Sequence, residues 1–294
     1  MSGYCSPDHH TLGEALHEHG AVLVRDSGLA SAEDFQRWLA ASRVELLAYD
    51  YGSTPRSQVS GRIYTSTEYP PHQTIPQHNE MSYTDRWPGR LWFFCAKPSL
   101  EGGRTPLCHA GEVLRKLDSS VRGRFESQGV MYVRNYNLGV DLTWQQAFGT
   151  SDRRAVERSA GERGLSIAWG PGDQLTTRQV AQAVTRHPVT GEVVWFNQAH
   201  LFHISAVEPS VREGLLAAFG EADLPRNAYY GNGRPIEDAV LDEIRGVYRE
   251  LTTGFDWQAG DVLVVDNVLV THGRTPFRGE RSVLVAMSEL QGKR

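Results

Sequence analysis

Two histidines and one glutamate are the residues of this sequence best suited to chemistry. In Gln77-His78-Asn79-Glu80 the histidine and the glutamate are two positions apart, so an extended backbone would point both side chains to the same face. Far downstream, His272 follows a predicted strand at Asp261–Asp266. Two histidines and one carboxylate on one face of an octahedral metal ion leave three positions open, which is the donor set of non-haem Fe(II) oxygenases.

The same residues also have a simpler interpretation. With eleven histidines, one His-x-Glu or His-x-Asp match is expected by chance, and His78-Asn79-Glu80 is the only one in the sequence. Lone histidines are more often surface groups or hydrogen-bonded core residues. His200 and His203, three positions apart, are a weaker second metal pair, for which packing or hydrogen bonding is the commoner role.

A keto-acid-dependent oxygenase also needs a cation for the distal carboxylate of 2-oxoglutarate. Arginine is suited to this because its planar guanidinium pairs with a carboxylate through two parallel hydrogen bonds. Arg281 precedes a predicted strand at Ser282–Met287 and comes nine positions after His272, so we expect it near the metal. Arg274 and Arg278 are competitors, and the alternative is that all three are surface arginines in a loop.

The elements that must position these residues are strands with helices inserted between them. Predicted strands are Ala21–Arg25, Arg90–Ala96, Met131–Arg134, Leu165–Ala168, Asp261–Asp266 and Ser282–Met287, with a β-hairpin joining Ala183–His187 to Glu192–Asn197. Predicted helices are His10–His19, one capped by Ser31, Leu142–Phe148, Arg153–Arg158, Val211–Phe219 and Ile236–Leu251. Strands at both ends favour a β-sandwich or jelly roll over alternating βαβ units. We expect one domain over residues 1–294, mainly β with helical insertions.

Composition excludes several classes of protein. The net charge of -5 and the pI of about 6.1 do not indicate a nucleic-acid or anionic-membrane partner. The three cysteines, Cys5, Cys95 and Cys108, are an odd number without C-x-x-C, which argues against disulfides and structural zinc. The N-terminus lacks the pattern of a signal peptide, and no apolar run approaches ~20 residues. A cytoplasmic protein is the prediction.

Several motifs occur in an order that resembles a known family. They are Gln77-His78-Asn79-Glu80-Met81-Ser82-Tyr83, Gly102-Gly103-Arg104-Thr105-Pro106, Val194-Trp195-Phe196-Asn197-Gln198, and Asp266-Asn267 through His272-Gly273-Arg274-Thr275-Pro276-Phe277-Arg278-Gly279-Glu280-Arg281. This set resembles the taurine dioxygenase/TfdA-type superfamily of Fe(II)/2-oxoglutarate oxygenases, closest to the branch of the syringomycin-biosynthesis aspartyl hydroxylase. The resemblance covers nearly the whole chain, and the combination is specific although each motif alone is weak.

The resemblance implies a double-stranded β-helix (jelly-roll) fold and a set of roles. His78, Glu80 and His272 would bind Fe(II), while Thr105 and Arg281 would bind 2-oxoglutarate, with O2 as the second cosubstrate. The branch implies hydroxylation of a small amino acid or amino-acid-derived unit in specialised metabolism, such as antibiotic biosynthesis, either free or tethered to a carrier protein. Glu80 argues against a halogenase, because similar halogenases leave that ligand position small for chloride.

This chain departs from the branch at two places. Arg104 stands where the branch often has an acidic residue before Thr-Pro, and Tyr230-Gly231-Asn232-Gly233 stands where it often has Tyr-Gly-Asp-Gly. Neither change touches the iron ligands, but both bear on substrate choice. Trp195, Phe196 and Asn197 are either core or cavity lining, and Ser82 and Tyr83 are close enough to the ligand strand to touch substrate.

Three alternative functions remain open. Desaturation or epoxidation would use the same iron site as hydroxylation. A cupin-like enzyme with another metal would usually carry further histidines near the first pair, and none is present. A non-catalytic β-sandwich binding module would make the triad accidental.

Overall fold

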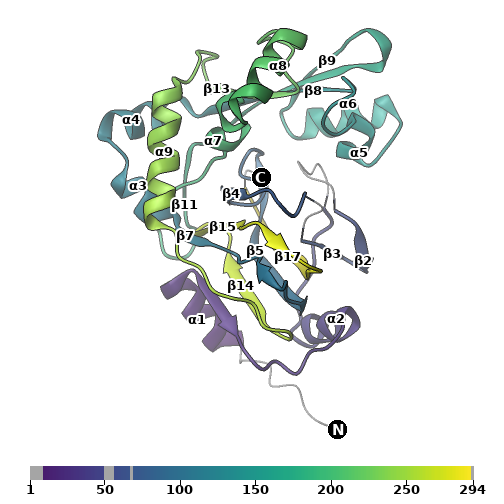
Figure 1. Ribbon diagram of the computed structural model, residues 1–294, viewed down its shortest axis with the longest axis vertical. Helices are drawn as coiled ribbons and strands as arrows, with labels where there is room; N and C mark the ends of the chain where they lie inside the picture. Colours follow the sequence, from purple (N-terminus) through teal and green to yellow (C-terminus); the bar gives the residue numbers. More distant parts are fainter. Residues whose placement is uncertain (1–8, 50–55, 67–68, 293–294) are drawn as a thin grey trace.

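The computed structural model describes residues 9–49, 56–66 and 69–292. Cys5 and the N-terminal segment assessed for a signal peptide lie outside these residues. Figure 1 shows a β-rich lower half, flanked by α1 (His9–His19) and α2 (Ala32–Ala41), and an upper half in which helices surround a smaller sheet. In the described part of the chain, no helix combines the length and the apolar character needed to span a membrane.

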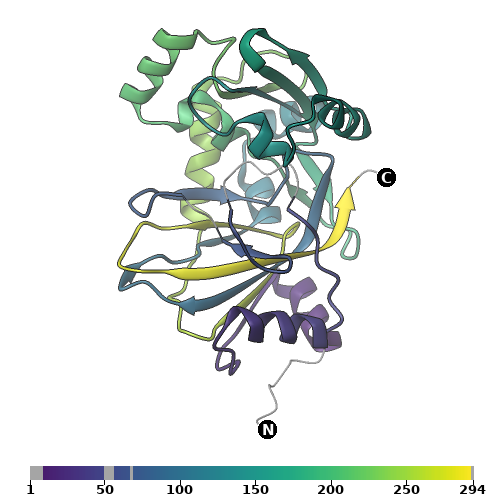
Figure 2. The ribbon, with the colours of Figure 1, turned by 90° about the vertical axis from the view of Figure 1, so that its right-hand side faces the viewer.

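A six-stranded antiparallel sheet dominates the lower half. Its order is β1 (Ala21–Val24), β14 (Val262–Asp266), β5 (Arg86–Lys97), β17 (Ser282–Gly292), β3 (Ile63–Thr65) and β2 (Gln58–Ser60). The longest pairing joins β5 to β17, which crosses the molecule as the yellow strand of Figure 2. This sheet therefore brings the middle and the end of the chain side by side.

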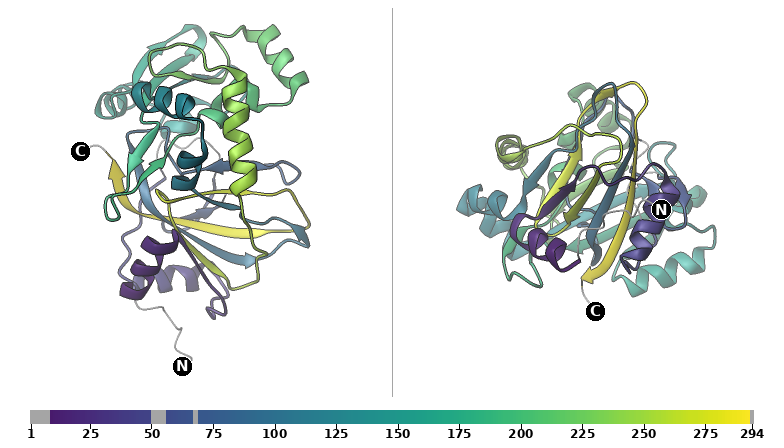
Figure 3. Two further views of the ribbon diagram at one scale, coloured as in Figure 1. Left: turned by 90° about the vertical axis from the view of Figure 1, so that its left-hand side faces the viewer. Right: turned by 90° about the horizontal axis from the view of Figure 1, so that it is seen from below.

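Alternation of side chains gives this sheet two buried faces. One face packs on α1 and α2, which lie against it in the right-hand view of Figure 3, through Trp92, Phe94, Val262, Val264, Leu284 and Ala286. The opposite face carries Leu91, Phe93, Cys95, Leu263, Val265, Val283, Val285 and Met287. Because both faces are apolar, the strands are nearly continuous runs of hydrophobic residues, as the sequence indicated.

A three-stranded sheet carries the two candidate histidine ligands. Its order is β4 (Ile75–His78), β15 (Val270–Arg274) and β7 (Leu107–His109). His272 pairs with His78 on one side and with Leu107 on the other. Gly273 allows the close approach of β4, because a Cβ atom there would lie 2.5 Å from the carbonyl oxygen of Ile75. The two histidines are thus neighbours on adjacent strands.

The remaining elements form the upper half and its connections. The third sheet has the order β13 (Arg226–Tyr230), β8 (Val130–Tyr136), β10 (Leu175–Ala181) and β9 (Ser166–Trp169), and two-stranded pairs are β11 (Val184–Arg186) with β12 (Val193–Trp195) and β6 (Glu101–Gly102) with β16 (Phe277–Arg278). Helices are α3 (Ala110–Lys116), α4 (Ser119–Gln128), α5 (Trp144–Phe148), α6 (Arg153–Glu162), α7 (Ala199–Phe202), α8 (Pro209–Phe219) and α9 (Asp238–Leu251), with short 3-10 turns at Pro171–Asp173 and Ile204–Ala206.

Most predicted elements are confirmed, with shifted ends. The helix predicted at Ile236–Leu251 is α9, which begins at Asp238 and buries its apolar stripe, and Ser31 caps α2 by accepting from Asp34 N. The hairpin around residues 188–191 forms between β11 and β12. Cys95 is a buried free thiol whose pKa burial raises to about 12.

Two predictions about the ligand region need correction. The strand β4 ends at His78, so Glu80 does not continue it but lies in the following turn. His272 does not merely follow a strand, because it lies in the middle of β15, which the sequence analysis did not predict. Its residues carry too few consecutive apolar side chains to stand out as a strand.

Candidate active site

His78, Glu80 and His272 converge on one point. A donor atom from each lies within 4.8 Å of the other two, and Nε2 of His78 is 4.0 Å from Oε2 of Glu80. The two imidazole rings have centroids 4.3 Å apart. Two nitrogens and one carboxylate oxygen are the donor set that suits a non-haem Fe(II) ion, so the residues fit the metal that their types predict.

Glu80 lies beyond the end of β4, and hydrogen bonds with Asn267 hold it in place. Its side-chain Oδ1 accepts from Glu80 N at 2.7 Å, and its Nδ2 donates to Glu80 O at 3.0 Å and to Pro88 O at 2.8 Å. Asn79 in turn donates to the carbonyl of Asn267 at 2.7 Å. All of these groups are buried, so the turn that carries Glu80 is fixed to the turn before β15.

Both histidines are prepared to act as neutral ligands. Nδ1 of His78 lies 2.9 Å from the carbonyl oxygen of Pro76 and donates to it, which leaves Nε2 as the acceptor that faces Glu80. Burial lowers the pKa of His78, and burial together with His78 and Arg56 lowers the pKa of His272 well below its ordinary value. Nδ1 of His272 is buried, and none of the residues that the structure describes forms a hydrogen bond with it.

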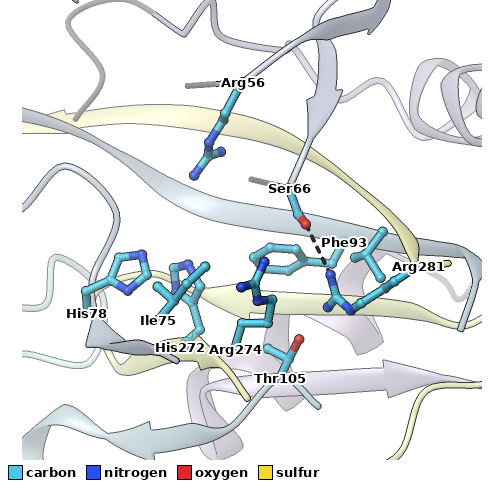
Figure 4. Close-up of a pocket in the computed structure, with 11 residues that line it drawn as sticks. Arg56, Ser66, Ile75, His78, Phe93, Thr105, His272, Arg274 and Arg281 are labelled. Carbon is cyan, nitrogen blue, oxygen red and sulfur yellow. Dashed lines mark hydrogen bonds between the residues drawn. The ribbon is translucent and has the colours of Figure 1, made fainter. Parts of the chain in front are cut away.

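A pocket opens beside the triad, between the two lower sheets. Figure 4 shows its lining: Arg56, Ser66, Ile75, His78, Phe93, Thr105, His272, Gly273, Arg274, Arg281 and Val283. Phe93 lies with its ring centroid 5.3 Å from that of His272 and forms a wall of the pocket. The pocket therefore contains both predicted 2-oxoglutarate contacts together with two of the three candidate metal ligands.

Arg281 has the properties of a receptor for a carboxylate. Its Nε donates to Gly103 O at 3.0 Å and its Nη1 contacts Ser66 Oγ at 3.5 Å, but no acidic side chain in the described chain pairs with it. Burial and, next, the charge of Arg274 lower the pKa of Arg281 to about 10. The guanidinium stays charged at neutral pH, and a bound carboxylate would relieve its desolvation.

Thr105 lies in the same pocket with a free hydroxyl hydrogen. Trp257 Nε1 donates to Thr105 Oγ1 at 3.0 Å, so the oxygen already accepts and the hydroxyl can donate to an anion. The preceding Gly103 has φ +67, and a Cβ atom there would lie 3.0 Å from the Arg281 side chain. Glycine at this turn allows the Thr105 loop and Arg281 to lie close together.

The other two candidate arginines, Arg274 and Arg278, differ in burial. Arg274 is buried in the pocket and donates to the backbone carbonyls of Tyr69, Pro70 and Gln73. Arg278 is on the surface, 84% exposed, near Glu101. The prediction that all three could be surface arginines is wrong for Arg274 and Arg281.

Several other expected site residues lie away from the pocket. His200 Nε2 bonds to the carbonyl of Gln77 at 2.9 Å and His203 accepts from Ser205 N, so both have the hydrogen-bonding role that competed with a metal pair. Trp195, Phe196 and Asn197 are fully buried and do not line the pocket. Ser82 and Tyr83 are also buried away from it, with Tyr83 packed on Tyr132 and Phe202.

Arg56 is a site residue that the sequence did not indicate. Its Nη2 donates to Oε2 of Glu80 at 2.6 Å, and only 5% of each side chain is exposed. Burial acts to lower the pKa of Arg56, but Glu80 together with Tyr49 and Tyr83 more than offsets this effect, so the pKa is raised. Arg56 precedes Glu80 by 24 positions and belongs to no recognisable motif, so only the fold reveals the contact.

The chain belongs to the family described as "Taurine catabolism dioxygenase TauD, TfdA family", whose model matches residues 3–287. With that match and the triad, it is an Fe(II)- and 2-oxoglutarate-dependent dioxygenase.

Two curated proteins are similar over most of their length. "Dapdiamide synthesis protein DdaC" of Enterobacter agglomerans is 40% identical over 279 residues, which covers 95% of this chain and 85% of that protein. A "clavaminate synthase-like protein" of Arabidopsis thaliana is 30% identical over 293 residues, covering 95% and 84%. Among solved structures, PvcB, described as an "Fe, alpha-ketoglutarate dependent oxygenase from an isonitrile synthetic pathway", has a TM-score of 0.51 at 16% identity, covering 95% of this chain and 78% of PvcB. That similarity concerns the fold.

Proposed function

We propose that His78, Glu80 and His272 hold Fe(II) and that Arg281 and Thr105 bind the distal carboxylate of 2-oxoglutarate. The observation that carries this proposal is the convergence of the three donors beside a pocket whose other end holds a buried arginine, for which the described residues provide no acidic partner. When bound, the iron and its cosubstrates supply the oxidising chemistry. The protein's own residues fix the geometry and keep the reacting centre away from water.

We infer that the reaction is hydroxylation of an unactivated C–H bond in a small amino acid or amino-acid-derived unit. The similarity to a dapdiamide synthesis protein supports a role in making a specialised metabolite. The substrate is presented either free or on a carrier protein. The chain acts as one oxygenase domain over residues 1–294, with its two lower sheets as the layers of a double-stranded β-helix.

Product analysis tests this proposal. Purified protein with Fe(II), 2-oxoglutarate and O2 is offered free amino acids and the same units as carrier-bound thioesters, and succinate release is measured. Hydroxylation predicts a product that gains one oxygen atom from O2 at a saturated carbon. Loss of two hydrogens would indicate desaturation, and oxygen gain at a carbon–carbon double bond would indicate epoxidation. Succinate release without any change in the amino-acid unit would contradict the proposal.

A further inference from the structure

Arg56 lines the pocket and faces the candidate metal ligands. It has no role in the proposed binding of Fe(II) or 2-oxoglutarate. Figure 4 shows its guanidinium pointing toward the two histidine rings, whereas Arg281 and Thr105 lie on the far side of Arg274. Its neighbour outside the site is Tyr49, whose ring centroid lies 4.6 Å from Cζ of Arg56. The position is therefore next to the metal and away from the proposed 2-oxoglutarate contacts.

The hydrogen bonds of Arg56 are incomplete. One nitrogen, Nη2, donates to Glu80, but Nε and Nη1 are buried and have no hydrogen-bond partner among the described residues. A buried donor without a hydrogen-bond partner is unfavourable, and more so when the group is charged. Support of Glu80 needs only the Nη2 contact. That role alone would leave the other donors of the guanidinium buried and unused. The free donors are suited to a second acceptor that enters the pocket.

The charges of the loaded site point to an anionic acceptor. Fe(II) and Arg281 together balance the Glu80 carboxylate and the two carboxylates of 2-oxoglutarate. Arg56 and Arg274 then remain as surplus positive charges, because the described residues that line the pocket include no acidic side chain and Arg274 donates its hydrogen bonds to neutral carbonyls. Buried charges without a counter-charge are costly, so an anion from outside would stabilise the site.

We propose that Arg56 binds an ionised carboxylate of the primary substrate through its free donors while it remains beside Glu80. This inference rests on the proposed function and narrows its substrate to one with a free carboxylate next to the metal. That carboxylate is either the α-carboxylate of a free amino acid or the side-chain carboxylate of a tethered one. Arg56 thereby positions the substrate relative to the metal ligand that it also contacts.

Anion binding to the anaerobic Fe(II)/2-oxoglutarate complex tests the proposal without turnover. Acetate is titrated against wild type, Arg56→Gln and Arg56→Lys, and the shift of the visible charge-transfer band is followed, with acetamide as the uncharged probe. Arg278→Gln, an exposed arginine, is the control. Acetate is expected to shift the wild-type band, with its dissociation constant raised at least tenfold in Arg56→Gln and less in Arg56→Lys, while acetamide has no effect.

Two further probes separate the sources of the carboxylate. L-Alanine carries only an α-carboxylate, whereas an L-aspartyl thioester carries only a side-chain carboxylate. A shift of the charge-transfer band that depends on Arg56, with either probe, supports the proposal and identifies the source of the carboxylate. Two results would overturn the proposed role of Arg56 and leave the proposed function intact. One is an equal acetate response in wild type and Arg56→Gln, and the other is loss of the band itself in Arg56→Gln. Absence of the band in wild type overturns the proposed function together with this inference.

Discussion

Arg278 ends β16 and Arg281 directly precedes β17, three positions later, yet their environments are opposite. Arg278 is on the surface, whereas Arg281 is buried in the pocket and contacts Gly103 and Ser66. The sequence predicted that an arginine near His272 would bind a carboxylate, but it left three candidates because charge and spacing do not report burial. Arg56 lay beyond prediction altogether, because its contact with Glu80 exists only in the folded chain.

Replacing Arg281 by Gln is expected to weaken 2-oxoglutarate binding by about 10- to 100-fold. A charge-assisted hydrogen bond contributes about 1.5–3 kcal/mol, and each 1.4 kcal/mol is tenfold in affinity. Calorimetric titration of the Fe(II)-loaded protein with 2-oxoglutarate under anaerobic conditions measures the change. Arg278→Gln is the matched control, and equal affinities for the two variants would refute the role assigned to Arg281.

At the scale of elements, the site depends on pairings that connect distant parts of the chain. The register of β4 on β15 sets His78 against His272, and Asn267 ties the Glu80 turn to the same region. The strands at Asp261–Asp266 and Ser282–Met287 could be predicted because both of their faces are buried and apolar. The strand β15 could not, since Thr271, His272 and Arg274 are buried polar residues held by the site itself.

Asn267→Ala is expected to weaken Fe(II) binding by about 10- to 100-fold, the usual effect of removing a group that orients a metal ligand. The substitution removes three hydrogen bonds that hold the backbone of Glu80 and Pro88, while the three side chains proposed to bind the metal are unchanged. Anaerobic Fe(II) titration provides the measurement. Asn232→Ala, on an exposed turn, serves as control, and unchanged iron affinity in Asn267→Ala would show that the Glu80 turn needs no such support.

At the scale of the whole molecule, folding buries several histidines in their neutral form. Burial lowers the pKa of His200 to about 3 and that of His203 to about 4, and the pKa of His272 also falls well below its ordinary value. The unfolded chain binds protons on these groups below pH ~6.5, whereas the folded chain does not. Acidification below that pH therefore favours unfolding, and stability rises again as pH increases toward ~6.5.

His200→Gln is expected to reduce this acid sensitivity. Over the 1.5 units from pH ~6.5 to ~5, a histidine that stays neutral when folded contributes about 2 kcal/mol to the loss of unfolding free energy, at 1.36 kcal/mol per unit. Urea unfolding of the metal-free protein at several pH values measures the slope. His19→Gln, at an exposed position of α1, should keep the wild-type slope; a wild-type slope in His200→Gln as well would contradict the buried neutral state of His200.

The central claim is that His78, Glu80 and His272 bind Fe(II) so that 2-oxoglutarate can chelate it. The most direct measurement is the visible spectrum of the anaerobic protein with Fe(II) and 2-oxoglutarate, recorded for wild type, Glu80→Ala, His272→Ala and the surface control Arg278→Gln. We predict a charge-transfer band in wild type and in the control and its loss in both ligand variants. An absent band in wild type, or an unchanged band in His272→Ala, would contradict the assignment of the iron site.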